Sequence, residues 1–119
     1  MTARRATEDA GSGSLLALAV LGCTIAALAL VIPLAVGLGL RQSAATAADA
    51  AALAGADVAA GIYPGSPCAI AASVAVSNSA HLDACETDGL VVTVRASIPF
   101  LGITLASSAT AGPANLVTN

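Results

Sequence analysis

A run of 31 residues without a charged side chain, from Ala10 to Leu40, most constrains what this chain can fold into. About 20 apolar residues in a helix cross the hydrocarbon core of a bilayer, and a helix satisfies its own backbone hydrogen bonds there. A cleaved secretory signal has an apolar core of only about 7–15 residues. We therefore predict a permanent membrane span over residues 15–40, preceded by a cytoplasmic tail over residues 1–14. Arg4 and Arg5, set against Arg41 alone on the far side, favour this orientation.

The composition excludes several classes of function. The net charge is -3 and the basic residues are four arginines, so no basic patch for nucleic acid can form. Tyr63 and Phe100 are the only aromatic residues, which argues against base stacking. No serine, cysteine or carboxylate has the neighbours that a nucleophile or an acid–base pair requires. We expect no enzymatic activity, no cofactor and no small-molecule substrate.

The apolar run continues into an alanine-rich segment without a helix breaker. Residues 42–60 contain no proline and one glycine, and alanine is the best helix former. We predict one continuous helix from about Ser14 to Ala60, whose outer part, residues 41–61, leaves the membrane as a stalk. One face of this helix carries Asp49, Leu53 and Asp57, and alanines surround the rest. Pro33 removes one backbone donor and predicts a kink between residues 30 and 37.

An alanine helix buries little surface in water, so the stalk needs a packing partner. The partner is either the domain of the same chain or another subunit. Small residues let helix backbones approach closely, in lipid as well as outside it. The predicted helix-packing positions are Gly22, Ala26, Ala48, Ala52, Gly55 and Ala56.

The residues after the stalk predict a small α+β domain over residues 62–113, followed by a loose tail over residues 114–119. Breakers from Gly61 to Pro67 end the long helix. A shorter helix with apolar residues at helical spacing, Ile70 and Val74, then packs on an antiparallel sheet of about three strands. The even positions of residues 90–98 are apolar, which predicts a strand with one buried face. The expected elements are a helix over residues 68–80, strands over 82–87, 90–98 and 103–110, a turn at Asp88-Gly89 and a bend over 99–102.

Cys68 and Cys85 both lie in this domain, whose core is marginal for its size. A disulfide closing such a loop adds about 3 kcal/mol of stability and needs an oxidising compartment. Free thiols are the first alternative. The second is a metal site built from these cysteines with His81 and Asp83, although the paired spacings of strong metal motifs are missing. We favour the disulfide, with His81 as a polar residue at a helix end.

Cys23 allows two interpretations. Val20-Leu21-Gly22-Cys23 has the pattern of a lipobox, in which the cysteine is acylated after the leader is removed. The residues from Thr24 to Leu40 remain apolar, whereas a lipidated cysteine normally opens a polar tether. We favour a small residue inside the span.

The order of these parts resembles a known family. A Gly-Ser-containing tail precedes the membrane helix, Ala47-Ala48-Asp49-Ala50-Ala51-Ala52-Leu53-Ala54-Gly55-Ala56 follows it, and Cys68 and Cys85 are spaced before an alternating strand. Nearly the whole chain is similar to the actinobacterial TadE-like proteins encoded near a helicase and tight-adherence (Flp pilus) secretion genes. The resemblance implies a membrane-anchored pilin-like fold. It also implies a minor pilin-like subunit of a type IV, tight-adherence apparatus, with lipid and other pilin-like or secretion subunits as partners.

Processing of the N-terminus bears on this role. Many pilin-like proteins carry a glutamate five residues after a processed glycine. Cleavage after Gly11 or Gly13, the candidate processing positions, places Leu16 or Leu18 there. This departure favours a minor, capping or accessory subunit over a major pilin. The alternatives are a single-pass accessory subunit that never polymerises and, third, a lipoprotein acylated at Cys23.

Overall fold

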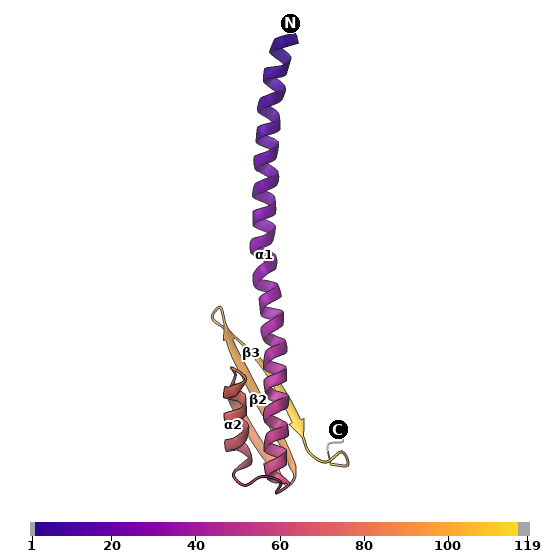
Figure 1. The fold of residues 1–119 in the computed structure, drawn as a ribbon, viewed down its shortest axis with the longest axis vertical. Coiled ribbons are helices and arrows are strands. Elements are labelled where there is room, and N and C mark those ends of the chain that lie inside the picture. Colours follow the sequence, from indigo (N-terminus) through magenta and orange to yellow (C-terminus); the bar gives the residue numbers. More distant parts are fainter. Residues whose placement is uncertain (1, 117–119) are drawn as a thin grey trace. The chain divides into compact units, whose positions relative to one another are not determined.

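The structure is a computed structural model that describes the backbone of residues 2–116 and the side chains of residues 11–116. Its elements follow the order α1 (Thr2–Ala59), α2 (Pro67–Ser77), β1 (His81–Asp88), β2 (Val91–Phe100) and β3 (Ile103–Ala111) (Figure 1). The chain divides into two units, Met1–Val36 and Gly37–Asn119. A long apolar helix, a short second helix and a three-stranded antiparallel sheet are therefore present, as predicted.

Helix α1 begins at Thr2, twelve residues before the predicted start at Ser14, and continues through Pro33. Because proline lacks an N–H, the carbonyl of Ala29 loses its helical donor there, but the bend predicted between residues 30 and 37 stays a prediction. The side chains of Arg4 and Arg5, which determine the predicted orientation, lie outside the described set. So do residues 117–119 of the predicted tail.

The end of α1 is a Schellman motif. The N–H of Ile62 donates to the carbonyl of Asp57 at 2.9 Å, and the N–H of Gly61 donates to that of Val58 at 3.0 Å. Gly61 has φ +79°, the left-handed conformation that this motif requires and that glycine adopts without strain. The predicted breaker at Gly61 therefore ends the helix by satisfying its last carbonyls.

The core of the second unit is built from small side chains. The C-terminal part of α1 and helix α2 pack on one face of the sheet, around the central strand β2 (Figure 1). Buried members come mainly from α1 (Ala44, Ala47, Ala48, Ala51, Ala52, Ala56), α2 (Ala71, Ala75) and β2 (Val92, Val94, Ala96, Ile98). Residues 41–61, predicted as a stalk apart from the domain at 62–113, thus supply the helix on which the sheet packs. Of the three residues predicted to share one face, Asp49 and Leu53 are exposed and Asp57 is half-buried.

The sheet is a meander of two hairpins in the order β1-β2-β3. The even positions of β2 face the helices and its other face carries Thr93 and Arg95, so the predicted alternation is confirmed. The loop between β1 and β2 is Gly89–Leu90, one residue later than the predicted Asp88-Gly89 turn. Gly89 has φ +60°. A type II′ hairpin turn requires a positive φ at its first central position, which is why glycine is usual there.

Strand β2 and helix α2 also depart from their predicted bounds. Strand β2 extends to Phe100 instead of bending at Pro99. The pairing of β2 with β1 ends at Ser97, so the N–H that Pro99 lacks is not needed for a hydrogen bond to β1. Helix α2 ends at Ser77, three residues before Ala80, and its buried residues are Ala71 and Ala75. They lie next in sequence to Ile70 and Val74, whose helical spacing predicted the helix. Both larger side chains are only half-buried.

Candidate membrane and assembly surfaces

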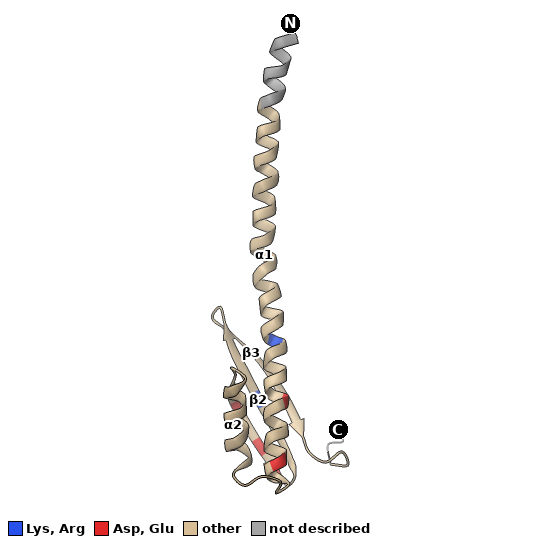
Figure 2. Cartoon of the chain, in the orientation of Figure 1, with Lys and Arg blue, Asp and Glu red and all other residues tan. Residues whose placement is uncertain are grey.

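The first unit presents a continuous apolar surface. Every large apolar side chain from Leu15 to Val36 is exposed, and the most apolar 18-residue window of α1 has none of its residues buried. No charged side chain occurs between Gly11 and Leu40, and Arg41 is the first one after this stretch (Figure 2). Exposed apolar patches far smaller than this mark interaction sites in soluble proteins. This stretch of helix is long enough and apolar enough to cross a membrane.

The predicted helix-packing positions separate into two groups. Ala48, Ala52, Gly55 and Ala56 are buried within the second unit, so the partner of the alanine-rich segment is the chain's own sheet and second helix. Gly22 and Ala26 are exposed, and a Cβ at Gly22 would meet nothing within 4 Å. The sequence left the partner of the alanines open because a core made of alanine carries no strong hydrophobic periodicity.

The predicted disulfide is present. Sγ of Cys68, at the start of α2, is bonded to Sγ of Cys85 in β1, across a sequence separation of 17. The hydroxyl of Thr87 lies 3.7 Å from Sγ of Cys68, and because a disulfide sulfur has no hydrogen the hydroxyl is the donor. The bond fastens α2 to β1, which is an edge strand of the sheet.

The alternative metal site does not form among these residues. Both cysteine sulfurs are in the disulfide and are not available as thiolate ligands. His81 is exposed and is the first residue of β1, not the end of a helix as predicted, and Asp83 lies at the bulge between Leu82 and Ala84. Within the described residues no group of three histidine, cysteine or acidic side chains gathers to hold a metal ion.

The remaining predicted positions lie on the exposed surface of α1. Gly11 and Gly13 have open space around them, since a Cβ at either would meet nothing within 4 Å. Cys23 is a free, exposed cysteine that lines a shallow apolar hollow with Ala19, Thr24 and Ala27. This geometry tests neither interpretation, so Gly11 and Gly13 stay candidate processing positions and acylation of Cys23 stays the alternative to a small residue inside the span.

The sequence did not predict the apolar surface at the tip of the β2–β3 hairpin. The loop between β2 and β3, which was expected to be a simple bend, is a two-residue hairpin turn at Leu101–Gly102, flanked by the pair Phe100 and Ile103. Leu101 and Gly102 have φ +48° and +79°, the pattern of a type I′ turn, which Asn, Asp and Gly normally occupy. The sequence did contain one sign of this surface, because Leu101 is an apolar residue in a turn where polar residues are usual.

Comparisons with protein-family models, with curated protein sequences and with solved structures yield no match to this chain.

Proposed function

We propose that this chain is a minor pilin-like subunit of a tight-adherence (Flp, type IV) pilus or secretion apparatus. In this proposal residues 15–40 span the cell membrane, the N-terminus is cytoplasmic and the domain lies outside the cytoplasm. The chain acts by assembly and not by catalysis. The observation that carries the proposal is the contrast within α1: its C-terminal part is buried by the chain's own domain, whereas the apolar side chains from Leu15 to Val36 are exposed.

In this proposal other subunits bind to the part of α1 that the domain leaves uncovered. Since Ala48, Ala52 and Ala56 are already covered by the second unit, they are not available to a neighbouring subunit. The apolar part of α1 can be covered by lipid or, in an assembly, by the apolar helices of other pilin-like subunits. Gly22 and Ala26 let such a helix approach closely. Assembly therefore takes place through the span.

The disulfide supports the orientation. Disulfides form and persist outside the reducing cytoplasm. The bond between Cys68 and Cys85 is therefore expected in a domain that is exported, which agrees with a cytoplasmic N-terminus before the span.

The test is the distribution of the chain between membranes and sheared filaments. The pilin-like role predicts that part of the chain sediments with filaments sheared from the cell surface. Gly22→Leu should reduce that fraction, because the larger side chain holds a neighbouring helix away, while the chain stays in the membrane. Leu28→Ile, an exchange of similar volume in the same segment, is the matched control and should behave like the parent. Strict retention of the parent chain in the membrane would contradict the proposal.

The second candidate is a single-pass accessory subunit of a secretion complex that is never polymerised. The leucines at positions 16 and 18 favour it, because they stand where many pilin-like proteins have glutamate after Gly11 or Gly13. Mass spectrometry of the mature N-terminus bears on this choice. A chain that starts at Ser12 or Ser14 has been processed like a pilin, whereas an intact tail favours the accessory subunit.

A further inference from the structure

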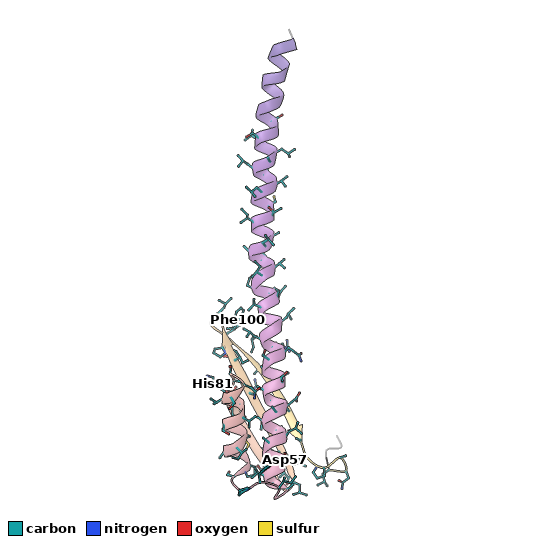
Figure 3. All side chains as sticks on the ribbon, in the orientation of Figure 1. Asp57, His81 and Phe100 are labelled. Carbon is teal, nitrogen blue, oxygen red and sulfur yellow. A yellow bond between two sulfur atoms is a disulfide. The ribbon has the colours of Figure 1, made fainter. Side chains whose placement is uncertain are left out.

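The tip of the β2–β3 hairpin is an apolar surface beside α1. A Cβ built on Gly37 would lie 3.6 Å from Cε1 of Phe100, so the aromatic ring is in van der Waals reach of the helix at that residue. Figure 3 shows Phe100 next to α1 at the end of the hairpin. Leu101 is 76% exposed, Ile103 is 59% exposed, and Leu38 on α1 is 63% exposed. The tip thus presents exposed apolar side chains at the level of Gly37 on the helix.

The position of the tip along α1 sets its height relative to the membrane. Gly37 precedes Arg41, the first charged residue after the apolar run, by four residues or about 6 Å of helix. If the apolar run spans the bilayer, the Phe100 ring therefore lies on the membrane side of the first cation. Arginine at such a boundary reaches the lipid phosphates while its stem stays in the apolar region. The tip is then at the height of the headgroups and the first methylene groups.

The apolar composition of the hairpin tip suits the membrane interface better than it suits water. Leu101 has φ +48°, a conformation in which Asn or Gly would be both less strained and better hydrated. No charged residue follows Arg95, so the tip has no charge to desolvate. The other hairpin, at the opposite end of β2, is different, because its Gly89–Leu90 loop follows Glu86 and Asp88.

The backbone limits how deep the tip can go. Loop N–H and carbonyl groups without partners are costly in the hydrocarbon core. A two-residue turn leaves few such groups, and the pair Phe100 and Ile103 closes the ladder directly before it. The region beyond Ser97 is a two-stranded ribbon without β1, so it extends past the rest of the sheet. Such a ribbon fits the boundary between headgroups and acyl chains, where amphipathic elements are buried by about 5–10 Å.

We propose that the β2–β3 hairpin tip, formed by Phe100, Leu101 and Ile103, inserts into the membrane interface beside α1. The occupant of this apolar surface is the lipid bilayer. The domain is then held at the membrane at two points, the helix and the hairpin, which restricts its rotation about the span. The inference rests on the membrane anchoring in the proposed function.

Spin labels on single cysteines test the insertion in the full chain, reconstituted in nanodiscs of phosphatidylcholine and phosphatidylglycerol. The Cys23→Ala background removes the one free thiol among the described residues. The labelled positions are Leu101→Cys at the tip, Leu90→Cys in the other hairpin and Leu28→Cys inside the span, with retention of the native disulfide checked by mass. Collision with oxygen, which concentrates in lipid, is compared with collision with a water-soluble nickel chelate.

Insertion predicts an oxygen-to-nickel accessibility ratio at position 101 that is several-fold higher than at position 90 and approaches that at position 28. Ile103→Cys should repeat the result of Leu101→Cys and guards against a local effect of one label. Equal ratios at positions 101 and 90, with position 28 in lipid, would overturn the insertion and leave the anchor intact. A water-exposed position 28 would overturn the anchor itself. Shielding of position 101 from both reagents would assign the tip to a second copy of the chain and would also overturn the proposal.

Discussion

Gly55 of α1 lies so close to Val92 of β2 that a Cβ on the glycine would stand 3.0 Å from Cγ1 of the valine. The same Cβ would stand 3.2 Å from the carbonyl oxygen of Pro67, at the start of α2. The helix therefore approaches both the central strand and the second helix where it has no side chain. The alanine-rich sequence of α1 is what allows this close packing.

Gly55→Ala is expected to destabilise the domain even though alanine is the better helix former. A methyl group at 3.0 Å from Val92 and 3.2 Å from a backbone oxygen must displace one of them. We expect the free energy of unfolding to fall by about 1–2 kcal/mol, the cost of overpacking less the gain in helix propensity. Urea unfolding of the full chain in detergent measures it. Gly39→Ala, in the same helix with open space around it, is the control and should lose no stability. Equal stability of the two variants would refute the close approach.

The disulfide is expected to contribute much of the stability of so small a core. Cys68 and Cys85 close a loop with a sequence separation of 17, for which the chain-entropy relation gives about 3 kcal/mol. The urea midpoint should fall by a corresponding amount on addition of a reductant, or in Cys68→Ser combined with Cys85→Ser. Cys23→Ser should respond to the reductant like the parent, since Cys23 is not bonded. An unchanged midpoint after reduction would contradict this account.

Val94 should be the sensitive position of β2. It is 1% exposed and is one of the largest fully buried side chains, so Val94→Ala removes buried methyl groups from a core that has few of them. We expect a loss of about 1.5–3 kcal/mol in the free energy of unfolding. Arg95→Ala alters the exposed face of the same strand and should change stability by no more than about 0.5 kcal/mol. Similar losses of unfolding free energy for the two variants would mean that the helices do not cover the even positions of β2.

Substitution of Cys23 distinguishes a chain anchored by its span from a lipoprotein acylated at that cysteine. If the span holds the chain in the membrane, Cys23→Ala should remain in the pellet after an alkaline carbonate wash, and the parent should take up no labelled fatty acid. The helix is uninterrupted through Cys23 and stays apolar after it, which is the basis of this expectation. Fatty-acid labelling that disappears in Cys23→Ala would establish the lipoprotein instead.

The sequence predicts those parts of the fold in which one physical signal dominates. The alternation from Val92 to Ile98 predicts β2 and its buried face, and Gly61 predicts the end of α1. The inner face of α2 is missed because Ala71 and Ala75 are less apolar than Ile70, yet only small side chains fit against α1 at Gly55. Local hydrophobicity contains no information about how closely two elements must approach.

The candidate surfaces are predictable to a similar degree. The charge-free run identifies the apolar surface of α1 directly, and the small size of the domain predicts the disulfide. The hairpin tip is missed because Pro99 and Gly102 predict a bend, and pairing between Phe100 and Ile103 depends on the end of a neighbouring strand. That dependence is a property of the sheet and cannot be read from residues 99–102 alone.

A cysteine on the exposed surface after β3 reports whether the chain has a single span with its domain outside the cytoplasm. Asn115→Cys in the Cys23→Ala background provides it. We predict that a membrane-impermeant maleimide labels this cysteine in intact cells and that the labelled chain stays with carbonate-washed membranes. Labelling only after lysis, or recovery of the chain in the soluble fraction, would contradict the account.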